Sequence, residues 1–193
     1  MFLLLPFIVL GIAVGLARGG ALSKLAQMPL RYGWLIILAF ALQVIIFLPW
    51  FESLPFSADA VPGLYMATML VLVVAIGLNL AIPAMRVVML GLLLNSIVIV
   101  ANGGFQPVPV EVVTRLGKAD KIEVMRATGH YSNWTLATPD TRLTFLGDVL
   151  VIPTLVMREN AFSVGDLILS LGILLLVEEG MVASRPRGAT FDS

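Results

Sequence analysis

Residues 63–82 read GLYMATMLVLVVAIGLNLAI, a run of 20 residues without a charged side chain. A helix of about 20 apolar residues is long enough to cross the hydrocarbon core of a bilayer, which is about 30 Å thick. A helix that is apolar on all its faces must be buried in lipid or in a large apolar core. This stretch therefore predicts a transmembrane helix and indicates a helical membrane protein.

Four further apolar runs lie on either side of it, at residues 2–17, 33–51, 87–101 and 164–182. The chain of 193 residues is 59% hydrophobic and 12% charged, whereas soluble domains have roughly 45–50% apolar and 25% charged residues. We therefore predict an all-α fold, a polytopic transmembrane helical bundle of about five spans.

Residues 143–157 form a sixth apolar stretch, which is interrupted by an aspartate and a proline. Because it is too short to span a bilayer, we expect a re-entrant or interfacial segment there. Residues 1–182 then make up a single transmembrane domain that includes an extracytoplasmic loop at 102–142. Residues 183–193 form a cytoplasmic tail.

The orientation follows from the charges of the short connections, because lysine and arginine concentrate on the cytoplasmic side. The first connection carries only basic charges: Arg18, Lys24 and Arg31. The second carries only acidic charges: Glu52 and Asp59. We therefore expect a multi-pass protein with its N-terminus outside and its C-terminus in the cytoplasm.

The loop at 102–142 is the most polar part of the chain. Apolar residues recur among charged ones over 109–128, which predicts one or two amphipathic helices at the membrane surface. His130, Tyr131 and Trp134 follow. Because Trp and Tyr are enriched at membrane–water interfaces, we expect these aromatic residues to belong to an aromatic belt.

Composition excludes several kinds of site. Twelve basic residues balance twelve acidic ones, so no basic field is present to attract nucleic acid. The chain has no cysteine and a single histidine, His130, which excludes disulfides, thiolate chemistry and multi-histidine metal sites. We expect no cofactor and no metal, and we expect the lipid bilayer to be the main partner.

Glycines in the first apolar run have a regular spacing. Gly11, Gly15 and Gly19 are separated by four residues each, so they share one helix face and allow another backbone to approach closely. The pattern predicts tight packing on this face, either against another helix of the same chain or against a membrane-protein partner.

Polar side chains inside apolar runs are the next candidates for function. Asn95 and Asn102 are seven residues apart, close to two helical turns, so they lie on one face of the predicted fourth span. Hydrogen bonds between helices are one interpretation of this face. The lining of a cavity is the other.

The sharpest chemical feature is a pair of aspartates, Asp148 and Asp166. If the segment between them dips into the membrane and returns, both carboxyl groups end at the same depth. Two carboxyl groups close together in a low dielectric share a proton, so one can activate water while the other donates to a carbonyl. This pair is therefore a candidate catalytic dyad.

The same aspartates have structural interpretations. Ser163 and Asp166 have the spacing of a capping box immediately before an apolar run, and an acid in the first turn also complements the helix dipole. Asp148 follows a glycine and could belong to a turn or an N-cap. An ion or proton site is a third interpretation of the pair.

Several short motifs together resemble a known family. NGGFQPV at 102–108, LGD at 146–148 and SVGD at 163–166 are similar to those of a bacterial family of small integral membrane proteins known only as a domain of unknown function. The resemblance extends over roughly residues 1–182. It implies a protein of the bacterial plasma membrane and implies no activity.

A second resemblance covers about the last third of the chain. Asp148 and Asp166 occupy places similar to those of the catalytic aspartates in lipoprotein signal peptidases, the aspartyl enzymes of the bacterial plasma membrane. Residues 102–105 resemble that family's outer Asn-x-Gly element, which implies that Asn102 orients substrate. The chain lacks the family's Gly-Asn-x-x-Asp-Arg motif.

Three functions follow from these features. The leading hypothesis is a non-catalytic component of a membrane assembly, because the first span has a glycine face and no catalytic motif is complete. The second is a membrane-embedded aspartyl hydrolase that uses Asp148 and Asp166, with Asn102 as an orienting group. The third is a protein that binds lipid or transports a small solute along the face of Asn95 and Asn102.

Overall fold

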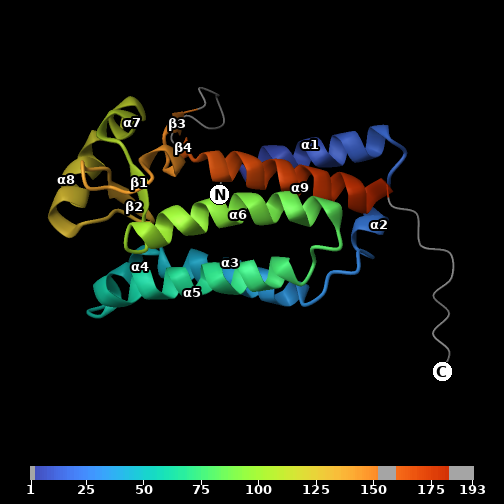
Figure 1. The fold of residues 1–193 in the computed structure, drawn as a ribbon, viewed down its shortest axis with the longest axis horizontal. Coiled ribbons are helices and arrows are strands. Elements are labelled where there is room, and N and C mark those ends of the chain that lie inside the picture. Colours follow the sequence, from blue (N-terminus) through green and yellow to red (C-terminus); the bar gives the residue numbers. More distant parts are fainter. Residues whose placement is uncertain (1–2, 152–159, 183–193) are drawn as a thin grey trace.

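The computed structural model describes residues 3–151 and 160–182, and it is mostly helical (Figure 1). Each of the five longest helices falls on a predicted span: α1 (Leu4–Ala17), α3 (Gly33–Ile46), α5 (Ser57–Gly77), α6 (Pro83–Ala101) and α9 (Val164–Val182). Two short helices, α2 (Leu22–Leu25) and α4 (Pro49–Glu52), follow α1 and α3. The apolar run at 33–51 is thus divided, because Pro49 begins a new helix rather than continuing α3.

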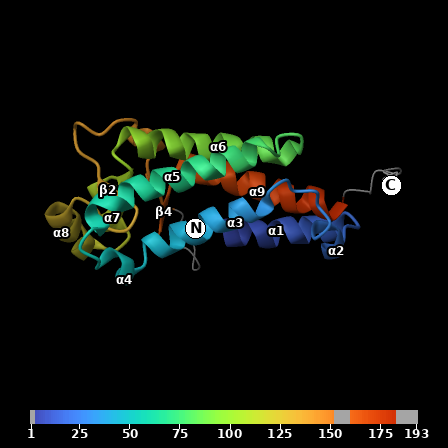
Figure 2. The same cartoon turned by 90° about the horizontal axis from the view of Figure 1, so that it is seen from below.

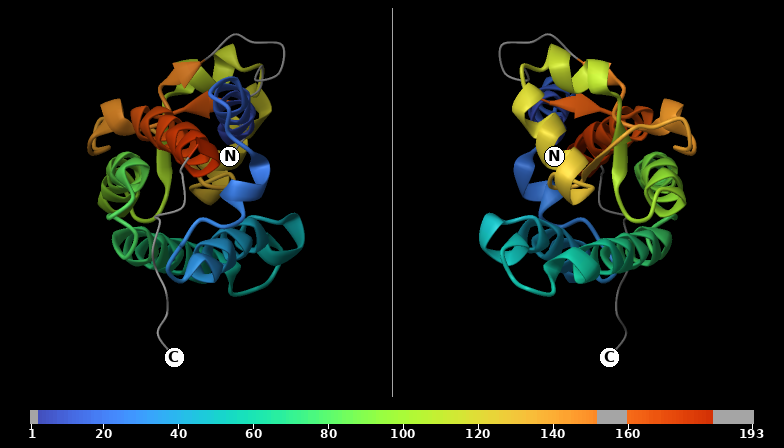
Figure 3. Two further views of the ribbon diagram at one scale, coloured as in Figure 1. Left: turned by 90° about the vertical axis from the view of Figure 1, so that its right-hand side faces the viewer. Right: turned by 90° about the vertical axis from the view of Figure 1, so that its left-hand side faces the viewer.

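The five long helices form an open arc. α1 packs on α9, α9 on α6, α6 on α5, and α5 on α3. The end-on views in Figure 3 look along the axes of these helices. Helices α1 and α3 are therefore the two ends of the arc, and within the described residues they make no extensive contact with each other.

Two described helical stretches are long and apolar enough to cross a membrane, Asp59–Gly77 in α5 and Pro83–Ala101, which is α6. Helices α1 and α3 have 14 residues each, which corresponds to about 21 Å and falls short of a hydrocarbon core of about 30 Å. Helix α9 has three acidic residues. The prediction of five spans is therefore not supported.

Residues 102–151 and 160–162 form a compact unit at one end of the helices, which we call the end module (Figure 2). Its helices are α7 (Val110–Arg115), α8 (Ala119–Thr128) and a 3-10 turn, η1 (Thr144–Leu146). Its strands are β1 (Gln106–Val108), β2 (Trp134–Leu136), β3 (Leu150–Val151) and β4 (Ala161–Phe162). β1 pairs with β2 in parallel, and β3 pairs with β4 antiparallel.

The end module bears on three of the predictions made from the sequence. The two amphipathic helices are present, and their apolar residues pack around Trp134 in a small core of their own. The purely α-helical prediction is wrong here, because strands of two or three residues are too short to show an alternating pattern in the sequence. In the predicted re-entrant segment, the described part is the η1 turn followed by β3. The rest of that segment, 152–157, and the tail at 183–193 lie outside the described residues.

Glycines set the closest helix contacts. A Cβ atom on Gly91 of α6 would lie 2.6 Å from the carbonyl oxygen of Gly165 on α9, and one on Gly172 would lie 2.6 Å from the backbone nitrogen of Val88. Only residues without a side chain allow two backbones to come this close. Gly11 of α1 meets the backbone of α9 at Leu174 in the same way, and Gly15 meets the side chain of Met181, so α9 of the same chain occupies that face. A membrane-protein partner there stays a prediction.

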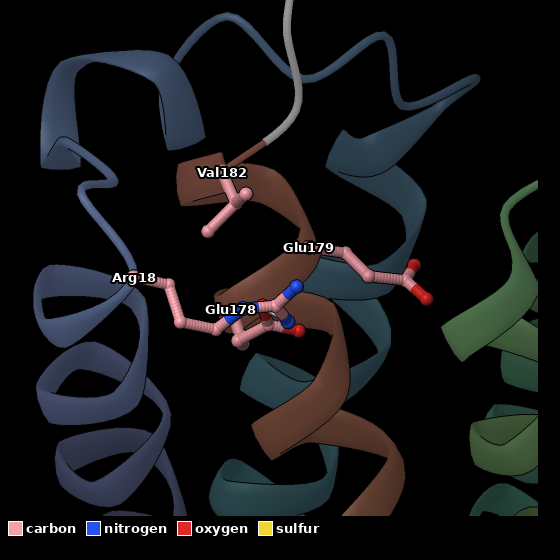
Figure 4. Close-up of a pocket in the computed structure, with 4 residues that line it drawn as sticks. All are labelled: Arg18, Glu178, Glu179 and Val182. Carbon is pink, nitrogen blue, oxygen red and sulfur yellow. Dashed lines mark hydrogen bonds and ion pairs between the residues drawn. The ribbon is translucent and has the colours of Figure 1, made fainter.

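The opposite end of the molecule carries the connections from α1 to α3 and from α5 to α6, together with the end of α9 (Figure 1). Arg18, which follows α1, forms an ion pair with the buried carboxylate of Glu178 on α9 (Figure 4). Glu179 points the other way and accepts a hydrogen bond of 3.3 Å from the backbone N–H of Ala84 at the start of α6. These two acids connect α9 to both of its neighbours.

A candidate ligand cavity beside the end module

A cavity of about 610 Å³ lies inside the arc and extends to the end module. Its apolar and aromatic lining comes from the five long helices, from the residues next to α1 and α3, and from the end module: Leu3, Leu4, Phe40, Val44, Phe47, Leu48, Met69, Leu72, Leu92, Ile99, Tyr131, Trp134, Ala161, Phe162 and Leu169. Its polar lining residues are Gln43, Tyr65, Asn95, Gln106, Lys118, Ser132, Asn133, Asp148, Asn160, Asp166 and Ser170. Most of the polar group belongs to the end module or to the turns of α6 and α9 nearest to it.

Asp148 is held at this polar end by the end module. Its backbone N–H donates to the carbonyl oxygen of Pro107, 2.9 Å away. Its Oδ2 accepts a hydrogen bond of 2.6 Å from the indole N–H of Trp134. Asp148 is 4% exposed, and its other carboxyl oxygen, Oδ1, has no hydrogen-bond partner among the residues that the structure describes. The side chain is therefore fixed on one side and free on the other.

The environment of Asp148 favours its neutral form. Burial, which disfavours the charged form, and then the negative charge of Asp166 raise the pKa of Asp148 from 3.8 to about 8. The hydrogen bond from Trp134, the nearby amide of Gln106 and the charge of the N-terminal amino group act in the opposite direction but are smaller effects. Asp148 therefore carries a proton at neutral pH when the cavity holds no compensating cation.

Asp166 is an N-terminal residue of α9 and forms the predicted capping box. The Ser163 Oγ accepts a hydrogen bond of 2.9 Å from the N–H of Asp166, and Asp166 Oδ2 accepts one of 3.1 Å from the N–H of Ser163. Asp166 Oδ1 accepts a further bond of 2.7 Å from the amide of Asn95 on α6. Both carboxyl oxygens of Asp166 thus accept hydrogen bonds, and an ionised carboxylate can act only as an acceptor.

The two aspartates share the cavity without touching. Both line it, and each influences the other electrostatically, but within the described residues neither carboxyl group hydrogen-bonds to the other. Asn102 does not line the cavity. Its side-chain oxygen accepts a hydrogen bond from the backbone N–H of Arg142, and its side-chain nitrogen donates one to the carbonyl oxygen of Arg142. The structure therefore brings Asp148 and Asp166 to one cavity and uses Asn102 to fix a loop.

Three buried polar atoms among the described residues have no hydrogen-bond partner, and all three belong to side chains that line this cavity. They are Gln106 Oε1, Asp148 Oδ1 and Ser170 Oγ. Their residues are between 1% and 4% exposed. Because an unpaired buried polar atom costs about 1–3 kcal/mol, their concentration in one place points to a ligand.

The sequence contained signals for some of these residues. Ser170 follows Asp166 by four positions, so it shares its helix face, and Gln106 lies within the first family motif. The aromatic belt predicted from His130, Tyr131 and Trp134 is wrong for Trp134, which is 8% exposed and bound to Asp148. His130 stacks on Phe105 instead.

Comparison with known proteins identifies one family. The sequence profile of a family of unknown function (DUF5317) matches residues 27–178, which confirms the prediction of an uncharacterised family. No curated protein and no solved structure matches the chain. A bacterial origin and the likeness to signal peptidases stay predictions.

Proposed function

The chain belongs to DUF5317, a family of unknown function, and we propose that it is an integral membrane protein that binds one amphipathic lipid in its central cavity. One observation carries this proposal: among the described residues, three unpaired buried polar atoms belong to side chains that line a cavity whose remaining lining is mainly apolar. A polar head group would pair these atoms, and an apolar chain would fill the rest.

The arc of helices suits entry from the bilayer. The cavity is lined by α1 and α3, the two ends of the arc, which make no extensive contact with each other in the part of the chain described. The acyl chain of a lipid in the membrane can therefore pass between α1 and α3 without separating any packed helix pair. The volume of about 610 Å³ is within the range of ligand pockets, roughly 300–1,000 Å³.

Tryptophan fluorescence tests the proposal. Trp34 and Trp50 are 61% and 57% exposed, so replacing both with phenylalanine leaves Trp134 at the cavity as the reporter. Lipids with brominated chains, added to the purified protein in detergent, are expected to quench Trp134 in a saturable way, because bromine quenches indole only at short range. The change Val44→Phe, at the α3 side of the cavity, is expected to weaken this quenching by filling the entrance.

A matched control lies on the same helix. Ile37 is 72% exposed and does not line the cavity, so Ile37→Phe adds the same ring to α3 without blocking anything. Quenching that rises linearly with lipid concentration, or that both variants weaken equally, would contradict binding in the cavity.

The predicted orientation is tested by labelling, since the chain has no cysteine. Ser23 in α2 and Ser53 after α4 are both exposed and lie at opposite ends of the molecule. A membrane-impermeant thiol reagent is expected to label Ser53→Cys in intact bacterial cells, and to label Ser23→Cys only after permeabilisation. The reverse pattern would invert the orientation, and equal labelling of both in intact cells would contradict a membrane-spanning protein.

An aspartyl hydrolase is the second candidate, favoured by the contrast between the two carboxyl groups. Asp166 accepts hydrogen bonds on both oxygens, which suits the charged form, whereas burial keeps Asp148 protonated. Asp166 could then take a proton from an attacking water while Asp148 donates its proton to the carbonyl oxygen of an ester or amide.

Product formation tests this candidate. Purified protein is incubated with acyl esters and acyl amides, and products are measured by mass spectrometry. If the dyad is catalytic, Asp148→Asn and Asp166→Asn each abolish turnover, while Asp140→Asn, an exposed aspartate, retains it. Thermal unfolding of each variant is measured in parallel, because Asp166 also caps α9. Turnover that survives Asp166→Asn would eliminate the dyad.

The role as a non-catalytic component of a membrane assembly stays a prediction. Its basis in the sequence was the glycine face of the first helix, and α9 of the same chain packs against Gly11 and Gly15. Gly19 does not continue that face, because α1 ends at Ala17 and Gly19 has a left-handed backbone with a φ of 75°. A partner protein that co-purifies through α1 would support the assembly role.

A further inference from the structure

The three unpaired polar atoms of the cavity are all oxygens. Two of the three unpaired atoms are oxygens of a carboxyl and an amide, Asp148 Oδ1 and Gln106 Oε1, and the third is the hydroxyl of Ser170. Gln106 Oε1 can only accept a hydrogen bond, and Asp148 Oδ1 becomes a pure acceptor once the carboxyl group loses its proton, whereas a hydroxyl such as that of Ser170 can donate or accept. A ligand that donates hydrogen bonds can pair all three atoms, whereas a fully ionised phosphate or carboxylate only accepts them and leaves Gln106 Oε1 unpaired.

The charges around the cavity have the same preference. The charged or titratable residues that line it are Lys118 from the start of α8, Tyr65 from α5, Tyr131 and Asp148 from the end module, and Asp166 from α9. Helices α1, α3 and α6 contribute none. Among the described residues, Lys118 is the one cation in this lining, and its Nζ lies 5.6 Å from the centre of the Trp134 ring. Lys118 balances one of the two carboxyl groups, so a positively charged ligand would balance the second when Asp148 loses its proton.

We propose that the polar end of the central cavity is a site for a protonated primary amine carried on an apolar chain, with Asp148, Gln106 and Ser170 as its hydrogen-bond acceptors. An ammonium group has three donors and no acceptor, so it matches three unpaired acceptor atoms. The inference rests on the proposed function and names the class of lipid, an aminolipid.

Binding of the amine is coupled to the proton on Asp148. The raised pKa of Asp148 arises mainly from burial, so an ammonium beside the carboxyl group stabilises the charged form and releases the proton. Affinity for the amine is therefore expected to rise by up to about tenfold per pH unit below pH 8, since one proton is released on binding.

The experiment uses the full chain with Trp134 as the fluorescence reporter and three single-chain probes that share one brominated tail. Their heads are a primary ammonium, a trimethylammonium and a phosphate monoester. The primary ammonium is expected to bind at least about tenfold more tightly than the other two, because a hydrogen bond between charged groups is worth about 1.5–3 kcal/mol. The trimethylammonium probe distinguishes the effect of charge from that of hydrogen bonding, because its head is positively charged but has no N–H to donate.

Asp148→Asn is the decisive variant, because asparagine can still accept the Trp134 hydrogen bond while it presents an N–H₂ donor to the cavity. It is expected to weaken primary-ammonium binding about tenfold and to remove the pH dependence. Asp140→Asn is expected to change neither. Phosphate or trimethylammonium binding as tightly as the primary ammonium would overturn the head-group assignment and leave lipid binding intact. Absence of quenching by all three probes would overturn lipid binding itself, and the assignment with it.

Discussion

Replacing Gly91 with alanine is expected to lower the free energy of unfolding by about 3 kcal/mol, at the upper end of the usual range for overpacked interiors. The new methyl group would lie 2.6 Å from the carbonyl oxygen of Gly165 and even closer to the backbone nitrogen of Leu169. Both are backbone atoms of α9, so no side chain can rotate away. The two helices have to separate, and α6 with α9 is the most extensive helix pair of the structure.

The matched control is Gly63→Ala on α5. A Cβ atom there meets nothing within 4 Å, and alanine is favoured over glycine in a helix by about 1 kcal/mol. Gly63→Ala should therefore leave the stability unchanged or raise it slightly. Unfolding is followed by circular dichroism in detergent for both variants. Equal behaviour of the two would show that the close approach of α6 and α9 does not limit stability.

Stability is also expected to fall as the pH rises from about 5 to 8, because of Asp148. Its folded-state pKa is about 8, against an ordinary value of 3.8. Between these values the folded protein holds a proton that the unfolded chain has released, so the slope of stability against pH is negative, at about 1.4 kcal/mol per pH unit for one group. This contribution is complete below about pH 4 and is lost as the pH passes 8.

Asp148→Asn is expected to remove this slope, because asparagine does not titrate and still accepts the Trp134 hydrogen bond. The comparison is the unfolding free energy of the two proteins at several pH values, with the exposed variant Asp140→Asn as a control that keeps the wild-type slope. A slope that persists in Asp148→Asn would mean that another group is responsible, and Asp148 would then be ionised in the folded protein.

The positions of the helices could be predicted from the sequence, because length and apolar composition are local properties. Val164–Val182 was predicted with the same bounds as α9. The capping box of Ser163 and Asp166 was also predictable, since its two residues lie three positions apart and form both bonds within one turn. The division of the run at 33–51 was not predicted, although Pro49 marks it. Helix positions, caps and breaks depend on residues that are close together in the chain, so the sequence alone can indicate them.

The tertiary structure alone decided what surrounds the two aspartates. Asp166 meets Asn95, which is 71 positions away, and Asp148 meets a tryptophan 14 positions away that the sequence assigned to a membrane interface. The parallel pairing of β1 with β2, and the position of Gly91 against α9, likewise join distant segments. The sequence by itself determined an apolar helical chain with two notable aspartates. The cavity that both aspartates line exists only because five helices form an arc around it. That arc depends on contacts between residues far apart in the sequence, which no local sequence pattern indicates.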